Sequence, residues 1–206
     1  MIDFRLYGIT DRKQCASVSP GRHIRALCAS GLRALQLREK DLQAAELFEL
    51  AGEIRKATLD HGTLLFINDR VDIAMAVGAD GVHCTEGSIP PDEVKSLDSS
   101  LLVGASIHTT QAASDAERSG ADFLLFGPVF QPASKEQKVK GQGLDRLASV
   151  CEAVQVPVLA VGGIEPGNSR QCLANQAAGV AAISSLMNAN DVVKRLGEFK
   201  TELEGL

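Results

Sequence analysis

The chain has 206 residues, of which 45% are hydrophobic and 23% are charged, and its formal net charge is −5. These values suit one globular domain. They exclude nucleic acid as an expected partner, because no stripe of Lys and Arg is present to neutralise a phosphate backbone. No window holds the roughly 18 apolar residues that a membrane span needs, and the start lacks a signal-peptide pattern. We therefore expect a cytoplasmic protein without a membrane partner; the oligomeric state, a homo-oligomer included, is left open.

Eight short apolar runs recur along the chain, each followed by a stretch with helical spacing. The runs cover residues 4–10, 34–40, 64–69, 79–84, 101–108, 121–130, 156–163 and 178–185. Runs that are too apolar to leave one face in water, and that alternate with helices, predict a parallel sheet covered by helices. Eight such units in this length predict a single-domain (β/α)8 TIM barrel over residues 1–206, with an open doubly wound sheet as the alternative.

Glycines mark the ends of several expected helices. Gly78 and Gly120 each stand before an Ala-Asp pair that opens an apolar run. We expect each of them to end a helix in the left-handed conformation, which glycine adopts without a Cβ penalty, and to begin a tight turn into the next strand. The repetition of this phrase supports a barrel that is built from similar units.

Polar residues follow the second apolar run, at the end where a parallel barrel carries its reactive groups. Gln36, Arg38 and Lys40 alternate with Leu37 and Glu39, so an extended backbone places the first three on one side. Two cations and an amide on one side are suited to holding a phosphate or a diphosphate. The alternative is a solvated strand end, in which Arg38 and Glu39 pair elsewhere.

The third run ends in Asn68 and Asp69, followed by Arg70. An acid and an amide at a strand end suit a hard cation such as magnesium, which prefers oxygen ligands and keeps several waters. Alternatively, Asp69 caps the helix that is expected to start at Arg70. The residues themselves favour neither interpretation.

The fifth run ends in Ser106 and His108, which stand two residues apart and therefore on the same side of an extended segment. His108 is able to move a proton near neutral pH. The alternative role for this histidine is that of a hydrogen-bonded structural group.

Two further segments are candidates for ligand binding. The longest strand-to-helix connection, residues 131–142, contains Ser134 and Lys135, and its length is typical of a lid, although a solvated charged loop is the alternative. Gly162 and Gly163 end the seventh run, and Ser184 ends the eighth. Glycines there let backbone N–H groups approach a phosphate, and a short helix after the eighth strand adds its positive dipole.

Taken in order, these motifs resemble the superfamily of thiamin-phosphate synthases and thiazole tautomerases (TenI-like) along essentially the whole chain. The matching motifs are YGITDR, LQLREK, FINDRVDIA, ADGVH, GASIHT, GADFLLFGPVF, the Ser134-Lys135 loop, VPVLAVGGI and AGVAAISSL. In the synthase branch, a hydroxymethylpyrimidine diphosphate loses diphosphate with the help of magnesium, and the nitrogen of a thiazole phosphate captures the resulting carbocation. The resemblance therefore implies Mg²⁺ as cofactor and small phosphorylated pyrimidine and thiazole compounds as substrates.

The resemblance also implies roles for individual residues. It places diphosphate contacts at Gln36, Arg38, Lys40, Asn68 and Lys135, a magnesium ligand at Asp69, a pyrimidine contact at Ser106, and the thiazole-phosphate site at Gly163, Ile183 and Ser184, with Ser134 and Gly162 adjoining. We expect Arg38, Lys40 and Lys135 to act in catalysis by stabilising the leaving diphosphate. Ser106 and His108 are the other catalytic candidates.

Two departures from the synthase pattern weaken the match. Ser88 stands where the family has a second magnesium-ligand aspartate, and Pro132 replaces the first threonine of a Thr-x-Thr-Lys motif. Glu86, two residues before Ser88, is able to substitute as a metal ligand. The loop TEGSIPP also looks like the tautomerase branch, in which no metal is needed and the histidine that corresponds to His108 acts as acid or base.

Three functions follow from this resemblance: a synthase-type transferase, a thiazole tautomerase that acts on a thiazole carboxylate phosphate, and a non-catalytic relative that binds a phosphorylated ligand. The altered metal loop is the only support for the third. We favour the synthase, because the retained Arg38, Lys40, Asn68, Asp69 and Lys135 have little purpose if no diphosphate binds.

Overall fold

A computed structural model describes residues 2–15, 19–131 and 140–204 of the chain. Within them, eight parallel strands close into a barrel in which each strand pairs with the next in sequence and β8 pairs with β1. The strands are β1 (Leu6–Ile9), β2 (Ala34–Leu37), β3 (Leu64–Asn68), β4 (Gly81–Cys84), β5 (Leu102–Ile107), β6 (Phe123–Phe126), β7 (Val158–Val161) and β8 (Gly179–Ala182). Each lies inside one of the eight predicted runs, so the predicted TIM barrel is confirmed.

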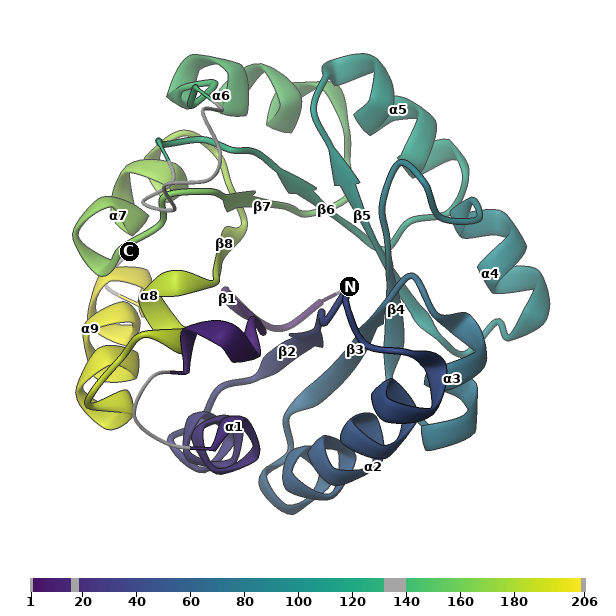
Figure 1. The fold of residues 1–206 in the computed structure, drawn as a ribbon. Coiled ribbons are helices and arrows are strands. Elements are labelled where there is room, and N and C mark those ends of the chain that lie inside the picture. Colours follow the sequence, from purple (N-terminus) through teal and green to yellow (C-terminus); the bar gives the residue numbers. More distant parts are fainter. Residues whose placement is uncertain (1, 16–18, 132–139, 205–206) are drawn as a thin grey trace.

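Helices surround the barrel, as Figure 1 shows in a view along its axis. They are α1 (Pro20–Ala29), α2 (Ala44–His61), α3 (Val71–Val77), α4 (Pro91–Leu97), α5 (Thr110–Arg118), α6 (Leu144–Ala153), α7 (Pro166–Ala174), α8 (Ser184–Met187) and α9 (Val192–Glu204), and a short 3₁₀ helix η1 (Arg12–Gln14) follows β1. The glycines predicted to end helices do so, since Gly78 (φ 63°) caps α3 and Gly120 (φ 88°) follows α5. No helix in the described part of the chain is both long and apolar enough to cross a membrane.

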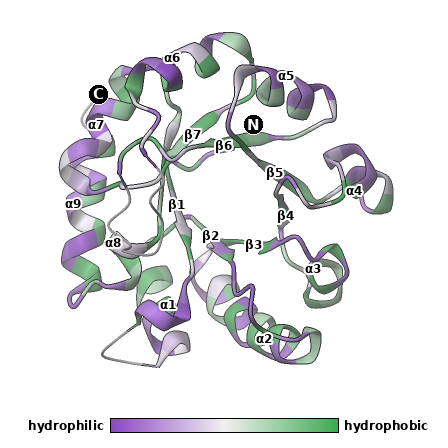
Figure 2. Cartoon of the chain, turned by 45° about the horizontal axis from the view of Figure 1, so that its top comes forward, coloured by the Kyte–Doolittle hydropathy of each residue, from purple (hydrophilic) through white to green (hydrophobic). Residues whose placement is uncertain are grey.

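Alternate residues of each strand point outward and meet the apolar faces of the helices. Leu35, Leu65, Val103 and Leu124 are fully buried in this outer layer together with helix residues such as Leu147. Figure 2 colours the chain by hydropathy, and hydrophobic residues of the helices lie toward the strands while hydrophilic residues lie toward the outside. Both faces of the strands are thereby removed from water, as the runs of apolar residues require.

A second cluster fills the inside of the barrel with aromatic rings. Phe4, Tyr7, Phe66 and Phe123 pack against one another with ring centroids 5.3 to 6.1 Å apart, mostly edge to face. Tyr7, Phe66 and Phe123 are completely buried. Gly104 of β5 makes room for Phe123, because a Cβ at this position would lie 2.9 Å from the Cε1 atom of that ring.

We expect Gly104→Ala to destabilise the protein by about 1 to 3 kcal/mol, because the added methyl group overpacks the interior against Phe123 and His83. Chemical denaturation monitored by circular dichroism measures the free energy of unfolding. Gly52→Ala in α2 is the matched control, since its Cβ meets nothing described within 4 Å, and it should raise stability by about 0.5 to 1 kcal/mol. Equal effects of the two substitutions would contradict the proposed packing constraint.

Candidate functional site

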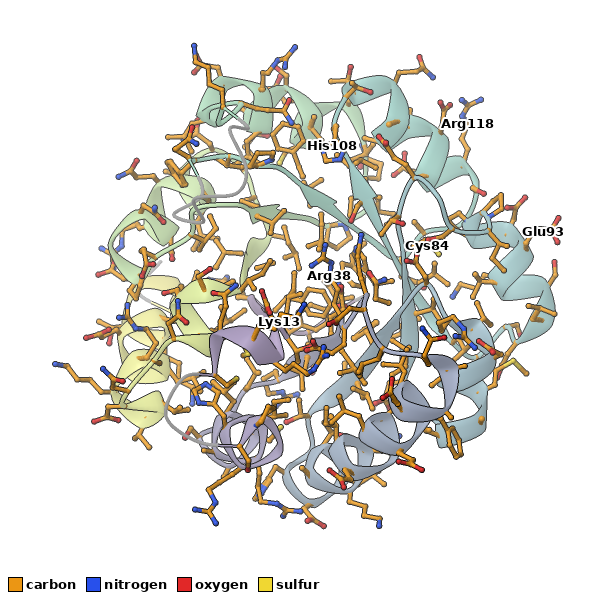
Figure 3. The ribbon with its side chains drawn as sticks, in the orientation of Figure 1. Lys13, Arg38, Cys84, Glu93, His108 and Arg118 are labelled. Carbon is orange, nitrogen blue, oxygen red and sulfur yellow. The ribbon has the colours of Figure 1, made fainter. Side chains whose placement is uncertain are left out.

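A cavity of about 990 Å³ opens at the C-terminal ends of the strands. Its walls come from all eight strand ends and the loops that follow them. Among the predicted site residues, those in the wall are Gln36, Arg38, Lys40, Asn68, Glu86, Ser106, His108, Gly162, Gly163, Ile183 and Ser184. In Figure 3, Arg38 lies over the middle of the barrel and His108 stands at its rim, whereas Glu93 and Arg118 project outward from helices.

Of the other three predicted residues, only Asp69 lies in the part of the chain that the structure describes. It lies next to this wall and is described below. Ser134 and Lys135 lie outside the residues that the structure describes, as does Pro132, so the expected lid and its contacts stay predictions. The eleven predicted residues named above lie together in the wall of one cavity. Their individual roles stay predictions.

Cationic groups gather at the end of β2. Gln36 is buried and its Nε2 lies 3.4 Å from the hydroxyl oxygen of Tyr7, whereas Arg38 is half-buried and Lys40 is exposed. The backbone N–H of Arg38 donates to the hydroxyl oxygen of Thr10 over 2.9 Å, which ties this strand end to β1. Among the described residues, neither Arg38 nor Lys40 forms an ion pair, so both charges are available to an anion in the cavity.

The neighbouring acid, Glu39, points away from these cations and is buried. Its carboxylate accepts from the backbone N–H of Arg12 and pairs with the Arg12 guanidinium at 3.0 Å. Arg12 and Lys13 also bind Asp41, and these hydrogen bonds hold the pKa of the Asp41 carboxyl well below its usual range. Sequence reasoning missed this network, which holds the β1 and β2 loops together and separates Glu39 from Arg38.

Asp69 directs its carboxylate to neighbouring side chains. Its Oδ2 accepts from Asn68 Nδ2 over 2.7 Å, and its Oδ1 accepts from the hydroxyl groups of Thr85 (3.0 Å) and Ser88. Its φ of 61° lies in the left-handed region, where the backbone N–H reaches the carbonyl oxygen of His83. The alternative that Asp69 caps α3 is wrong, because within the described chain that helix has Arg70 as N-cap and no side-chain cap.

Sequence reasoning also missed a buried pair on β4 and β5. The His83 side chain is buried, and its Nε2 lies 2.9 Å from the hydroxyl oxygen of Ser106. The pKa of His83 is lowered from 6.5 to about 3, mainly by burial, with Asp69 raising it and the nearby Arg38 lowering it, so the ring is neutral. The motif Gly81-Val82-His83 could have predicted the burial of His83. Side chains alternate between the two faces of a strand, so His83 lies on the same inward face as Gly81.

His108 is held at the cavity rim by the chain after β6. Its Nδ1 lies 2.6 Å from the carbonyl oxygen of Gly127, which also accepts from Gln142 Nε2 over 2.9 Å. A carbonyl oxygen only accepts, so Nδ1 carries the hydrogen of the neutral ring and Nε2 has a free lone pair. The arrangement is able to accept a proton from a bound molecule.

Backbone amides form the part of the wall that follows β7 and β8. Gly162 and Gly163 have φ values of 94° and 65°, and a Cβ at Gly163 would lie 2.7 Å from the carbonyl oxygen of Gln131. Ser184 begins α8, with Ile183 as its N-cap. The first N–H groups of a helix have no intrahelical partner, so this end of the cavity offers donors and positive dipole to an anion.

Comparisons with known proteins show the family to which this chain belongs. The family model described as thiamine monophosphate synthase matches residues 6–186. The thiamine-phosphate synthase of Moorella thermoacetica is 41% identical over 186 residues, covering 88% of this chain and 89% of that protein. The one of Pyrococcus abyssi is 36% identical over 200 residues, covering 97% and 95%. The solved thiamine phosphate pyrophosphorylase of Pyrococcus furiosus has a TM-score of 0.88 and 35% identity over 98% of this chain and 96% of that one. The chain belongs to the thiamine monophosphate synthase family.

Proposed function

We propose that this protein joins hydroxymethylpyrimidine diphosphate to thiazole phosphate, releases diphosphate and forms thiamin phosphate. The observation that carries the proposal is that one cavity is lined by two separate groups of residues that each suit an anion. The first contains Arg38 and Lys40 after β2, and the second contains Gly163 and Ser184 after β7 and β8. Two separate regions suit two phosphorylated substrates, whereas a single phosphorylated ligand needs only one of them.

The chemistry requires stabilisation of a leaving group. The bond between the pyrimidine methylene carbon and the diphosphate oxygen breaks, and the thiazole nitrogen then forms a bond to the same carbon. Negative charge grows on the departing diphosphate, so Arg38 and Lys40 stabilise the transition state more than the ground state. Tyr7 and Phe123 are completely buried inside the barrel, so an apolar layer lies beneath the strand ends that carry these cations.

The residues next to the cationic region suit the magnesium ion that the family resemblance implies. Among the described residues, no three side chains of the types His, Cys, Asp and Glu form a cluster that could hold a metal ion. However, Asn68 Oδ1 is buried without a hydrogen-bond partner in the described chain, and Asp69 Oδ2 accepts one hydrogen bond although it has two lone pairs.

Asn68, Asp69 and Glu86 would hold Mg²⁺ together with oxygens of the diphosphate, which is the usual way in which this ion binds at phosphate sites. When bound, the ion supplies positive charge to the leaving diphosphate. The hydroxyl groups of Thr85 and Ser88 keep Asp69 in place in this arrangement.

A second candidate function is a thiazole tautomerase, and the position of His108 favours it. Its Nδ1 makes the hydrogen bond to Gly127, and its Nε2 has no hydrogen-bond partner among the described residues at the rim of the cavity, as proton transfer to and from a thiazole requires. In that case the amides at Gly163 and Ser184 would anchor the phosphate, and no metal would take part.

We expect the purified protein to form thiamin phosphate from the two substrates when Mg²⁺ is present and to stop when a chelator is added. The physical reason is that the side-chain cations Arg38 and Lys40 balance only part of the negative charge of the diphosphate. Product is measured by oxidation to a fluorescent thiochrome. Turnover that survives chelation would argue against the metal site, and binding of thiazole phosphate without turnover would favour a non-catalytic relative.

Arg38→Ala should lower kcat/KM at least about 100-fold, because it removes a cation from the leaving diphosphate. Steady-state kinetics with varied pyrimidine diphosphate measure the effect. Arg118→Ala is the control, since that side chain is 72% exposed on α5 and projects away from the barrel (Figure 3). A change of less than threefold in Arg38→Ala would contradict its role.

His108→Ala separates the two candidate functions. A synthase should lose less than about tenfold in kcat, because leaving-group departure requires little proton transfer, whereas a tautomerase should lose at least about 100-fold when its acid–base group is removed. Both activities are assayed on the same preparation, the second by proton NMR of the thiazole carboxylate phosphate. Loss of isomerisation with retained transfer would assign His108 to the tautomerase alone.

A further inference from the structure

The hydrogen bond between His83 and Ser106 has one fixed direction, from donor to acceptor, which the proposed reaction does not require. The imidazole of His83 packs against both Tyr7 and Phe123, with ring centroids 6.0 Å from each. Its Nε2 bonds to Ser106, and its Nδ1 is buried without a hydrogen-bond partner among the described residues. Nδ1 faces Gly104, at which a Cβ would lie only 2.6 Å away. The ring is thus held on both sides.

This environment selects one tautomer of the neutral ring. A hydrogen on Nδ1 would be a buried donor without an acceptor, which is rare in folded proteins. A hydrogen on Nε2 instead points at the Ser106 oxygen, at 2.9 Å, and leaves only an unpaired acceptor at Nδ1. An N–H at Nε2 makes Ser106 an acceptor in this pair, so the Ser106 hydroxyl hydrogen is free to point elsewhere. Both side chains line the cavity, so that hydrogen is available to a ligand.

We propose that His83 is a positioning residue that makes the Ser106 hydroxyl a hydrogen-bond donor to a ring nitrogen of the pyrimidine substrate. The inference rests on the proposed function for the identity of the ligand. Without His83, the hydroxyl group of Ser106 could rotate and act either as a donor or as an acceptor. It would then accept a hydrogen bond from an amino group as readily as it donates one to a ring nitrogen. With its oxygen occupied by His83, the hydroxyl selects an acceptor, and the pair acts as a specificity determinant.

The tautomer can be read directly from the wild-type protein. ¹⁵N–¹H NMR of protein labelled at its four histidines distinguishes a protonated Nδ1 from a protonated Nε2, and comparison with His83→Gln assigns the signal. We expect the hydrogen on Nε2 of His83. A hydrogen on Nδ1 would overturn the inference, whatever reaction the protein performs.

Ligand selectivity is measured by calorimetric titration with the aminopyrimidine alcohol and with two aminopyridine analogues, each of which has C–H in place of one ring nitrogen. We expect wild-type protein to bind one analogue roughly tenfold more weakly than the pyrimidine, because one hydrogen bond is lost. Ser106→Ala and His83→Leu should abolish this difference. His83→Gln should restore most of it, since its amide is also able to donate to Ser106.

His23→Gln is the matched control, because His23 is also buried and its Nε2 lies 2.9 Å from the carbonyl oxygen of Leu186, in α8. It should alter stability and leave the selectivity between analogues unchanged. A folded His83→Leu protein that keeps the tenfold selectivity would show that His83 is only structural and overturn the inference. Absence of thiamin phosphate formation by the wild type counts against the proposed function alone, since neither measurement depends on turnover.

Discussion

The closed ring of eight parallel strands depends on filling its interior with side chains that alternate along each strand. In this protein four aromatic rings do so, and Gly81 and Gly104 leave the space that Phe66 and Phe123 occupy. Because the rings are buried and packed edge to face, the barrel is closed beneath the cavity. Polar groups at the strand ends therefore meet above an apolar layer, where electrostatic interactions are stronger than in water.

The loops around this layer are arranged so that cations remain available. Glu39 is drawn toward Arg12, and Asp41 pairs with Arg12 and Lys13, so the acids adjacent to Arg38 and Lys40 along the chain are occupied elsewhere. Asp69 is also held, through Asn68, Thr85 and Ser88. The result is a cavity in which one region carries positive charge and the region around Gly163 and Ser184 offers backbone donors.

In the pair formed by His83 and Ser106, we infer that a fully buried group acts through a half-buried one. His83 is neutral because it is removed from water, and a neutral imidazole has both a donor and an acceptor nitrogen. Which nitrogen carries the hydrogen follows from the surroundings of Nδ1 and not from the bond to Ser106 itself. A group of this kind orients a substrate and takes no part in bond breaking.

The sequence by itself determined the strands, the barrel and the position of most site residues. Strands of a parallel barrel are apolar on both faces and end at one edge, so runs of apolar residues and the polar residues after them place Gln36, Arg38, Ser106 and Ser184 in one cavity. Only the tertiary structure decided which partner each polar group takes. Glu39 pairs with Arg12, which is 27 residues away, and His83 pairs with Ser106, 23 residues away. Such pairs are formed between neighbouring strand ends and loops, whose separation in space is set by barrel closure and is not visible in local spacing.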